Sequence, residues 1–249
     1  MRNLCITLLA FSSTLLTGCA TYTDVREHTD LQQEATKIRS VVIIPPEVSI
    51  NVLSFNGDTE KDVEKQNYTT NKIKSDTRYQ LKKKGVNIVE FDFEKALSSN
   101  SELAFAITQC KESMEKSEKS LYKTRVEEKN KSKFSENIGP SANSIAEATG
   151  ADAFLIIKYN GFRKSSGLIA KEMAANILLA AALGVGRGAP MEGADIEIAL
   201  ISASSGALLW IDKKQYPQLE QYAPQQMFKD FPKLEWSKEA INNPQASTN

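Results

Sequence analysis

The chain has 249 residues, of which 41% are apolar and 25% are charged. Its 31 basic and 31 acidic residues balance, so no overall basic excess points to a nucleic-acid partner. With one histidine, His28, and three cysteines, a metal centre or a histidine-dependent catalytic triad is hard to build. The length allows one good core, with room for a helical appendage.

Residues 1–18 have the features of an export signal. Arg2 gives a small positive start, and residues 4–11 form an apolar run. This run is shorter than the about 20 apolar residues that a bilayer-spanning helix needs. A plain secretory signal cut near Ala20, or a buried N-terminal helix, would also fit these features.

The segment Leu16-Thr17-Gly18-Cys19 decides between these alternatives. It resembles the lipobox of bacterial lipoproteins, in which the cysteine is linked to diacylglycerol, becomes the new N-terminus and is then N-acylated. The resemblance implies cleavage between Gly18 and Cys19 and lipidation of Cys19. Several acyl chains, at about 0.8 kcal/mol per buried methylene, anchor a protein far more firmly than one. Apart from these covalent lipids we expect no cofactor and no metal.

Two further consequences follow from cleavage and lipidation. The residue after the cysteine is Ala20 rather than Asp, which in lipoproteins of double-membraned bacteria implies the outer membrane. We therefore expect the chain at the periplasmic face of that membrane, if its source is such a bacterium. Because Cys5 is removed and Cys19 is acylated, Cys110 is left alone, as a small buried hydrophobe or as a site of intermolecular pairing.

The mature chain divides by composition into three parts. Residues 19–38 are polar with little periodicity and predict a tether, which reaches about 60 Å at most if it is extended. Residues 39–235 predict a single folded domain. Residues 236–249 are polar and predict a disordered tail.

The first half of the domain predicts strands and helices in alternation. The β-branched run 41–44 is typical of a strand buried on both faces, and Pro45-Pro46 ends it. Residues 48–55 predict a second extended piece. The chain then predicts a helix from Thr59 to Lys84, a strand over 86–91 and a short helix over 92–97.

Ser101 opens the longest predicted helix, which extends to about Phe134. Beyond Lys111 this segment is rich in Lys and Glu. The main interpretation is a solvated helix face, and the alternative is an arm that protrudes toward a partner, with Lys111 and Lys123 as candidate contacts. One apolar stripe recurs at helical spacing along it: Leu103, Ile107, Cys110, Met114 and Leu121.

The second half begins with a helix over 141–150 and a continuous apolar strand over 153–159, best placed at the centre of the sheet. Residues 161–167 predict a loop, in which Arg163 and Lys164 are further candidate contacts. The segment 168–186 is rich in Ala and Leu. It is interpreted first as a buried or surface-packed helix, with an oligomer contact and membrane insertion as alternatives.

The C-terminal part predicts a β-hairpin at the sheet edge, with strands over 194–202 and 207–211. Asp195 and Glu197 share one strand face, which a solvated edge strand explains better than a substrate site. Trp210 is interpreted as packing rather than as a ligand platform. A closing helix is expected over 222–234. The fold class is therefore α/β, with a mixed sheet of about five strands, packed helices and one long charged helix.

No catalytic motif stands out. The glycine-rich segment 184–188 follows a helix, which is the wrong setting for a phosphate-binding loop, and no Gly-x-Ser-x-Gly elbow is present. Cys110 and His28 are placed too differently to form a catalytic dyad. We therefore expect that the chain is not an enzyme.

Several structural motifs carry a resemblance to a family of uncharacterised proteobacterial lipoproteins. More distantly, the chain is similar to the curli-secretion lipoprotein and to lipoprotein activators of penicillin-binding proteins. These motifs are strand stops, helix caps and turns, so the resemblance implies a fold and a compartment but no active-site residue. They are Pro45-Pro46-Glu47-Val48, Ile138-Gly139-Pro140, Thr149-Gly150-Ala151-Asp152-Ala153, Gly184-Val185-Gly186, Ser205-Gly206 before Leu209-Trp210, and Asp230-Phe231-Pro232.

The leading functional hypothesis is a membrane-anchored, non-enzymatic lipoprotein that binds envelope proteins in envelope assembly, secretion or cell-wall synthesis. One alternative is a subunit of an oligomeric outer-membrane pore or secretion channel, in which residues 168–188 contact the membrane or other copies. Another is an enzyme or small-ligand carrier, which a deep pocket with converging polar groups would favour.

Overall fold

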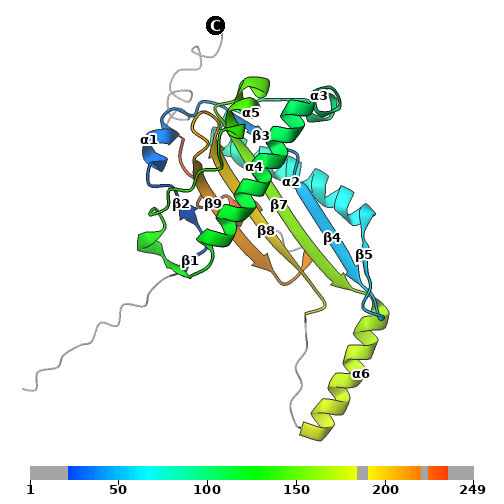
Figure 1. Cartoon of the computed structure of the whole chain (residues 1–249). Coiled ribbons are helices and arrows are strands. Elements are labelled where there is room, and N and C mark those ends of the chain that lie inside the picture. The colour runs from blue at the N-terminus through cyan, green and yellow to red at the C-terminus, as the bar shows by residue number, and fades with distance from the viewer. Residues whose placement is uncertain (1–21, 184–189, 220–223, 235–249) are drawn as a thin grey trace, which may run out of the picture.

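The computed structural model describes residues 22–183, 190–219 and 224–234 (Figure 1). The signal, its cleavage site and Cys19 lie outside these residues. So do residues 184–188 and the C-terminal segment 236–249.

A mixed sheet of seven strands forms the centre of the domain. Its order is β2-β9-β8-β7-β4-β5, and β3 also pairs with β7, so the predicted α/β class is confirmed with more strands than expected. The additional strands are the short pieces β2 and β5, which carry no alternating apolar pattern. The seven strands are β2 (Arg26–Glu27), β3 (Val41–Ile43), β4 (Glu47–Leu53), β5 (Thr59–Lys61), β7 (Ala153–Lys164), β8 (Glu192–Ser202) and β9 (Leu208–Tyr216).

β7 is the central strand, as its apolar run predicts. It pairs in parallel with β3 and β4 and antiparallel with β8. Leu155 and Ile157 face one hydrophobic core, while Phe154 and Ile156 face a second core on the other side of the sheet. Such burial on both faces is typical of a strand with helices packed on each side.

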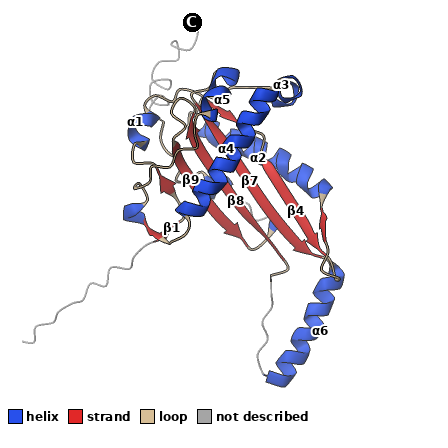
Figure 2. Cartoon of the chain, in the orientation of Figure 1, coloured by secondary structure: helices blue, strands red, loops and turns tan. Residues whose placement is uncertain are grey.

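Helices cover both faces of the sheet, whereas α6 extends away from it (Figure 2). α4 and α5 cover one face, and α2 and α7 cover the other. The α-helices are α1 (Leu31–Ala35), α2 (Val63–Lys83), α3 (Phe93–Ser99), α4 (Ser101–Leu121), α5 (Ser141–Thr149), α6 (Ser166–Leu183) and α7 (Pro224–Met227). Asp62, Asp92 and Asn100 cap α2, α3 and α4, because each side chain accepts a hydrogen bond from a backbone N–H in the first turn.

The prediction of a tether over residues 19–38 is wrong for residues 22–38. β2 pairs with β9, and α1 follows it. Val25, Leu31 and Ile38 are each 3% exposed or less. Arg26 is also buried and donates to the carbonyl oxygens of Leu121 and Thr23. This segment therefore belongs to the folded edge of the sheet, although its sequence is polar.

The long charged helix is shorter than predicted and does not project. α4 ends at Leu121, and a loop that contains β6 (Val126–Glu127) and a 3-10 turn (Glu128–Asn130) replaces its predicted second half. β6 pairs with β1 (Tyr22–Thr23) in a separate two-stranded sheet. The apolar stripe of the predicted helix stops at Leu121, and the helix stops with it.

Three smaller predictions are also corrected. The helix predicted from Thr59 begins at Val63, after β5. The strand predicted over 86–91 is reduced to one bridge, between Ile88 and Val41. The hairpin of β8 and β9 is not at the sheet edge, because β7 flanks β8 and β2 flanks β9.

Candidate functional site

α6 is the most exposed helix of apolar composition in the described chain. It leaves the end of β7 and extends away from the sheet (Figure 1). Two contacts tie the base of α6 to the domain: Lys164 Nζ lies 2.6 Å from Glu172 Oε2, and Lys171 Nζ lies 4.6 Å from the ring centre of Phe55. The helix therefore starts from a fixed point and extends away from the sheet (Figure 1).

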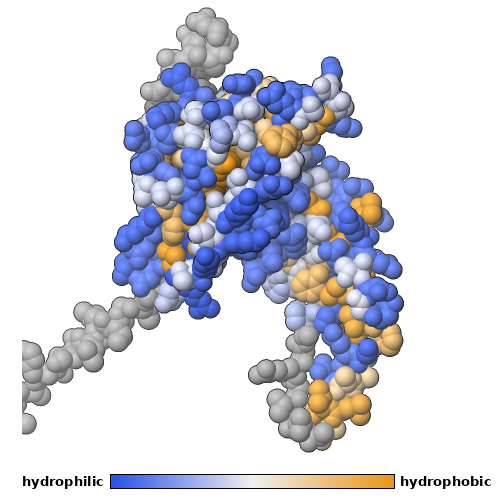
Figure 3. All heavy atoms as spheres, viewed as in Figure 1, coloured by the Kyte–Doolittle hydropathy of each residue, from blue (hydrophilic) through white to orange (hydrophobic). Residues whose placement is uncertain are grey.

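The distal half of α6 presents large apolar side chains to solvent. Figure 3 shows them as a hydrophobic region at the far end of the helix. Met173 is 55% exposed, Ile177 66%, Leu178 72% and Leu179 49%. A contiguous exposed patch of this kind marks a contact site in soluble proteins, and isolated exposed residues do not.

The sequence of α6 explains why no single face is buried. Between Met173 and Leu183 the only polar residue is Asn176, so apolar side chains surround the helix. Helices that are apolar on all sides are found enclosed by protein or lipid. Within the described residues no helix is both long and apolar enough to cross a bilayer. The first interpretation, a helix packed on its own domain, is wrong for this distal half.

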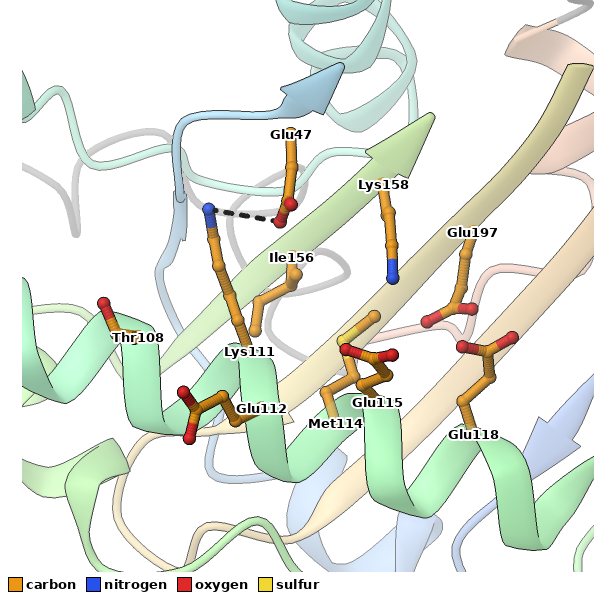
Figure 4. A pocket seen from close by; sticks show the side chains of 10 residues that line it. All are labelled: Glu47, Thr108, Lys111, Glu112, Met114, Glu115, Glu118, Ile156, Lys158 and Glu197. Atoms are coloured by element: carbon orange, nitrogen blue, oxygen red, sulfur yellow. Dashed lines mark ion pairs between the residues drawn. The ribbon is translucent and has the colours of Figure 1, made fainter. Parts of the chain in front are cut away.

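A second feature is a cleft between α4 and the sheet (Figure 4). Its volume is about 310 Å³, and Met114 from α4 and Ile156 from β7 supply apolar lining. Five glutamates and two lysines also line it: Glu47, Glu112, Glu115, Glu118 and Glu197, with Lys111 and Lys158. The cleft is therefore a polar hollow between two well-packed elements.

Glu197 is the most buried of these side chains, with 4% exposure. It stands on β8 directly between Lys158 of β7 and Lys213 of β9 in the strand register. Lys213 donates to Glu118 of α4 above it. The Oε1 atom of Glu197 accepts no hydrogen bond from the described residues.

Burial, followed by the negative charge of Glu118 and a hydrogen bond with it, raises the pKa of Glu197 to about 8. Lys213 and Lys158 act in the opposite direction. The prediction that Glu197 lies on a solvated edge strand is therefore wrong. Strand alternation correctly placed Glu197 and Asp195 on one face, but sequence alone does not reveal that α4 covers that face.

The four predicted contact residues do not form one surface. Lys111 lies in the cleft, 3.7 Å from Glu47 Oε2, and Lys123 is exposed just after α4. Arg163 pairs with Asp62 at 2.9 Å. The side chain of Lys164 is only 9% exposed and forms an ion pair with Glu172. Because neighbouring strand residues face opposite sides, Arg163 and Lys164 point away from each other.

The remaining singled-out residues are structural. Cys110 is fully buried on α4, and burial raises the pKa of its thiol to about 12. Trp210 is also fully buried, edge-on to Phe231 at 5.3 Å between ring centres, which confirms the packing interpretation. His28 is 8% exposed in the folded N-terminal segment, and its Nδ1 accepts from the backbone N–H of Asp30.

No protein-family model matches the chain, and no curated protein matches its sequence. Among solved structures, it is similar to the lipoprotein GNA1162 from Neisseria meningitidis, with 12% identity and a TM-score of 0.30 over 84% of this chain and 98% of that one. It is also similar to the LpoB C-terminal domain from Salmonella enterica, with 14% identity and a TM-score of 0.27 over 77% and 96%. Both scores are low, so neither similarity decides the function of this chain. The similarity to curli-secretion lipoproteins stays a prediction.

Proposed function

We propose that the chain is a lipid-anchored envelope protein that acts by binding other proteins and not by catalysis. Cys19 would carry the diacylglycerol and the N-acyl chain and hold the domain at the periplasmic face of the outer membrane. The process it serves would be envelope assembly, secretion or cell-wall synthesis. The observation that carries the proposal is the exposed apolar distal half of α6.

The position of α6 supports this proposal. β2 runs antiparallel to β9, so the residues before Arg26 lead toward the end of β9 at Tyr216. In the strand register this is also the end of the sheet where β7 stops, at Lys164, and α6 begins. Cys19 precedes Tyr22 by three residues, which span about 11 Å at most. An acylated Cys19 would thus bring the membrane close to this end of the sheet, and the partner of α6 would be a protein at the membrane surface.

Two measurements test the two halves of the proposal separately. Metabolic labelling with palmitate should mark the wild-type chain and should be lost in Cys19→Ala. Labelling that persists in Cys19→Ala would contradict lipidation at Cys19. Pull-downs from cross-linked envelopes should recover a specific protein with the wild type and should lose it when Ile177, Leu178 and Leu179 are replaced by Gln.

Glutamine is a good helix former, so this triple variant removes apolar surface with little effect on the helix itself. A matched control replaces three exposed residues of α2, Val63, Tyr68 and Tyr79, by Gln; these are 59%, 63% and 63% exposed. The control should keep the partner. Equal recovery with both variants would contradict a role for α6.

The second candidate function is a subunit of an oligomeric pore or secretion channel. The same observation favours it, because a helix that is apolar on all sides can be enclosed by neighbouring copies of the chain. Sedimentation in detergent should then give the mass of a discrete oligomer, and the purified chain should release dye from liposomes. A strict monomer with no leakage would remove this candidate.

A further inference from the structure

The cleft beneath α4 contains a buried hydrogen-bond acceptor that no described residue satisfies. The Glu197 carboxylate points into the cleft (Figure 4), and its Oε1 has no donor. Leaving a buried polar atom without a partner destabilises the fold whether the carboxyl group is neutral or ionised. Native proteins contain few such atoms, and among the described residues Glu197 Oε1 is the one that lies in the cleft, where a donor from outside could reach it.

The lysines nearest to the cleft do not supply that donor. Lys213 donates to Glu118, and Lys111 pairs with Glu47. Lys158 faces Glu197 across the strand pair, yet Oε1 remains without a hydrogen bond. The lining therefore has one acceptor atom without a hydrogen bond, Glu197 Oε1, and more carboxyl groups than ammonium groups.

This excess of carboxylates selects the charge of the ligand, because an anion would be repelled and a cation attracted. Among the residues that the structure describes, no group of three or more His, Cys, Asp or Glu is placed to hold a metal ion. The expected cation is therefore one that brings its own hydrogen-bond donors. A primary ammonium has three N–H donors and a guanidinium has five.

We propose that the cleft between α4 and the sheet binds an organic cation with N–H donors, an alkylammonium or a guanidinium, and that Glu197 accepts a hydrogen bond from it. The volume of about 310 Å³ is at the small end for ligand sites and suits one such side chain or a short diamine. Met114 and Ile156 would contact its methylene groups. The source of the cation is either a Lys or Arg of a partner protein or a free amine. The inference does not depend on the lipid anchor or on α6.

Binding at this site is coupled to a proton. Burial beside Glu118 raises the pKa of Glu197 to about 8, so its carboxyl group carries a proton at neutral pH. A cation in the cleft favours the ionised form and displaces that proton. The charged or titratable groups that interact with Glu197 are Glu118 and Tyr122 at the α4 side, Lys158 on β7 and Lys213 on β9. Affinity should therefore rise with pH up to about 8 and level off above it.

Isothermal titration of the full-length chain in a neutral detergent tests the site. The probes are 1,5-diaminopentane, N-acetyl-lysine amide, N-acetyl-arginine amide and tetramethylammonium, each in two buffers of different ionisation enthalpy. The first three should bind with proton release, and tetramethylammonium, which has no N–H, should not. Preference for the amino-acid amides assigns the cation to a protein, and preference for the diamine assigns it to a free amine.

The decisive variant is Glu197→Gln, which keeps the size of the side chain. Above pH 8, where the Glu197 carboxyl group is ionised, it should weaken binding at least tenfold, because Gln carries no negative charge to attract the cation. Glu147→Gln, on the exposed surface of α5, makes the same charge change outside the cleft and should bind as the wild type does. A ¹³C titration of the Glu197 carboxyl in the wild type adds a test without a variant, since the diamine should lower its midpoint. Absence of binding at millimolar probe, equal affinity of Glu197→Gln, or an unmoved midpoint would overturn the proposal.

Discussion

The ammonium group of Lys164 lies 2.6 Å from the carboxylate of Glu172 and ties the base of α6 to the end of β7. The Lys164 side chain is only 9% exposed, so this ion pair is screened less by solvent than a surface pair. It fixes the direction in which the apolar distal half of α6 leaves the domain.

Replacing Lys164 by Met should release the base of α6. Removal of one partner leaves Glu172 without its cation, and the first turns of the helix lose their fixed point. Hydrogen exchange should become faster along α6, while the amides of β7 and β8 keep their protection. Lys171→Met, which removes only the stacking on Phe55, should have the smaller effect. Unchanged exchange in Lys164→Met would contradict the role given to this pair.

Arg26 should contribute strongly to stability, although it lies in a segment that the sequence predicts to be a tether. Its guanidinium donates to carbonyl oxygens of Leu121, Thr23 and Val25 and lies 4.5 Å from the ring centre of Tyr122. Arg26→Lys cannot reproduce this planar fork and should lower the free energy of unfolding by about 2–3 kcal/mol.

Urea denaturation measures this difference. Arg39→Lys is the matched control, since Arg39 is exposed and a surface change of this kind alters stability by about 0.5 kcal/mol or less. Equal midpoints for the two variants would show that residues 22–38 add little to the fold.

Glu197 should make stability depend on pH in a defined direction. Its pKa in the folded chain is about 8, above the ordinary 4.5, so the folded state binds the proton more tightly than the unfolded state. The contribution is fully present below pH 4.5 and is lost as the pH rises to about 8, at about 1.4 kcal/mol per unit of pKa difference.

Unfolding curves of the wild type and Glu197→Gln between pH 4 and pH 9 isolate this effect, because the other titrating groups are shared. The wild type should lose stability relative to the variant over this interval. Two parallel curves would show that Glu197 titrates normally.

Cys110 should be inert toward thiol reagents in the folded chain. It is fully buried, and burial raises its pKa to about 12, so almost no thiolate is present at pH 8. In a chain with Cys5→Ser and Cys19→Ser, reaction with a disulfide reagent should occur only as fast as unfolding. Rapid labelling under native conditions would restore the alternative of intermolecular pairing.

The parts of the fold that follow from local patterns could be predicted from the sequence. The continuous apolar run in β7, the short helix that begins after Asp92 and the turn at Gly206 each depend on a few neighbouring residues. Predictions failed where a distant element decides the outcome. From the sequence alone, Arg26 would be placed on the surface, and only the position of Leu121 at the end of α4 explains its burial. Residues 22–38 are folded because β2 pairs with the free edge of β9.

The candidate site shows the same division. Lipidation of Cys19 follows from a local motif and stays a prediction, because Cys19 lies outside the described residues. The apolar composition of α6 was visible in the sequence, but it favoured a packed helix, and only the structure shows that the distal half is exposed. The cleft was missed, because Glu118 and Glu197 are 79 residues apart in sequence numbering (197 − 118) and only the packing of α4 on the sheet joins them. Neither the sequence around Glu118 nor the sequence around Glu197 indicates that the two side chains lie close together.

The claim that α6 is a protein-binding element is tested most directly by photo-crosslinking in living cells. A benzophenone amino acid at Leu178, which is 72% exposed, is compared with one at Tyr79, which is 63% exposed on α2. We expect one discrete adduct from position 178, heavier than the chain by the mass of a different envelope protein, and none from position 79. An adduct of twice the chain mass would favour the oligomeric alternative. No adduct at position 178, or the same adducts from both positions, would contradict a protein-binding role for α6.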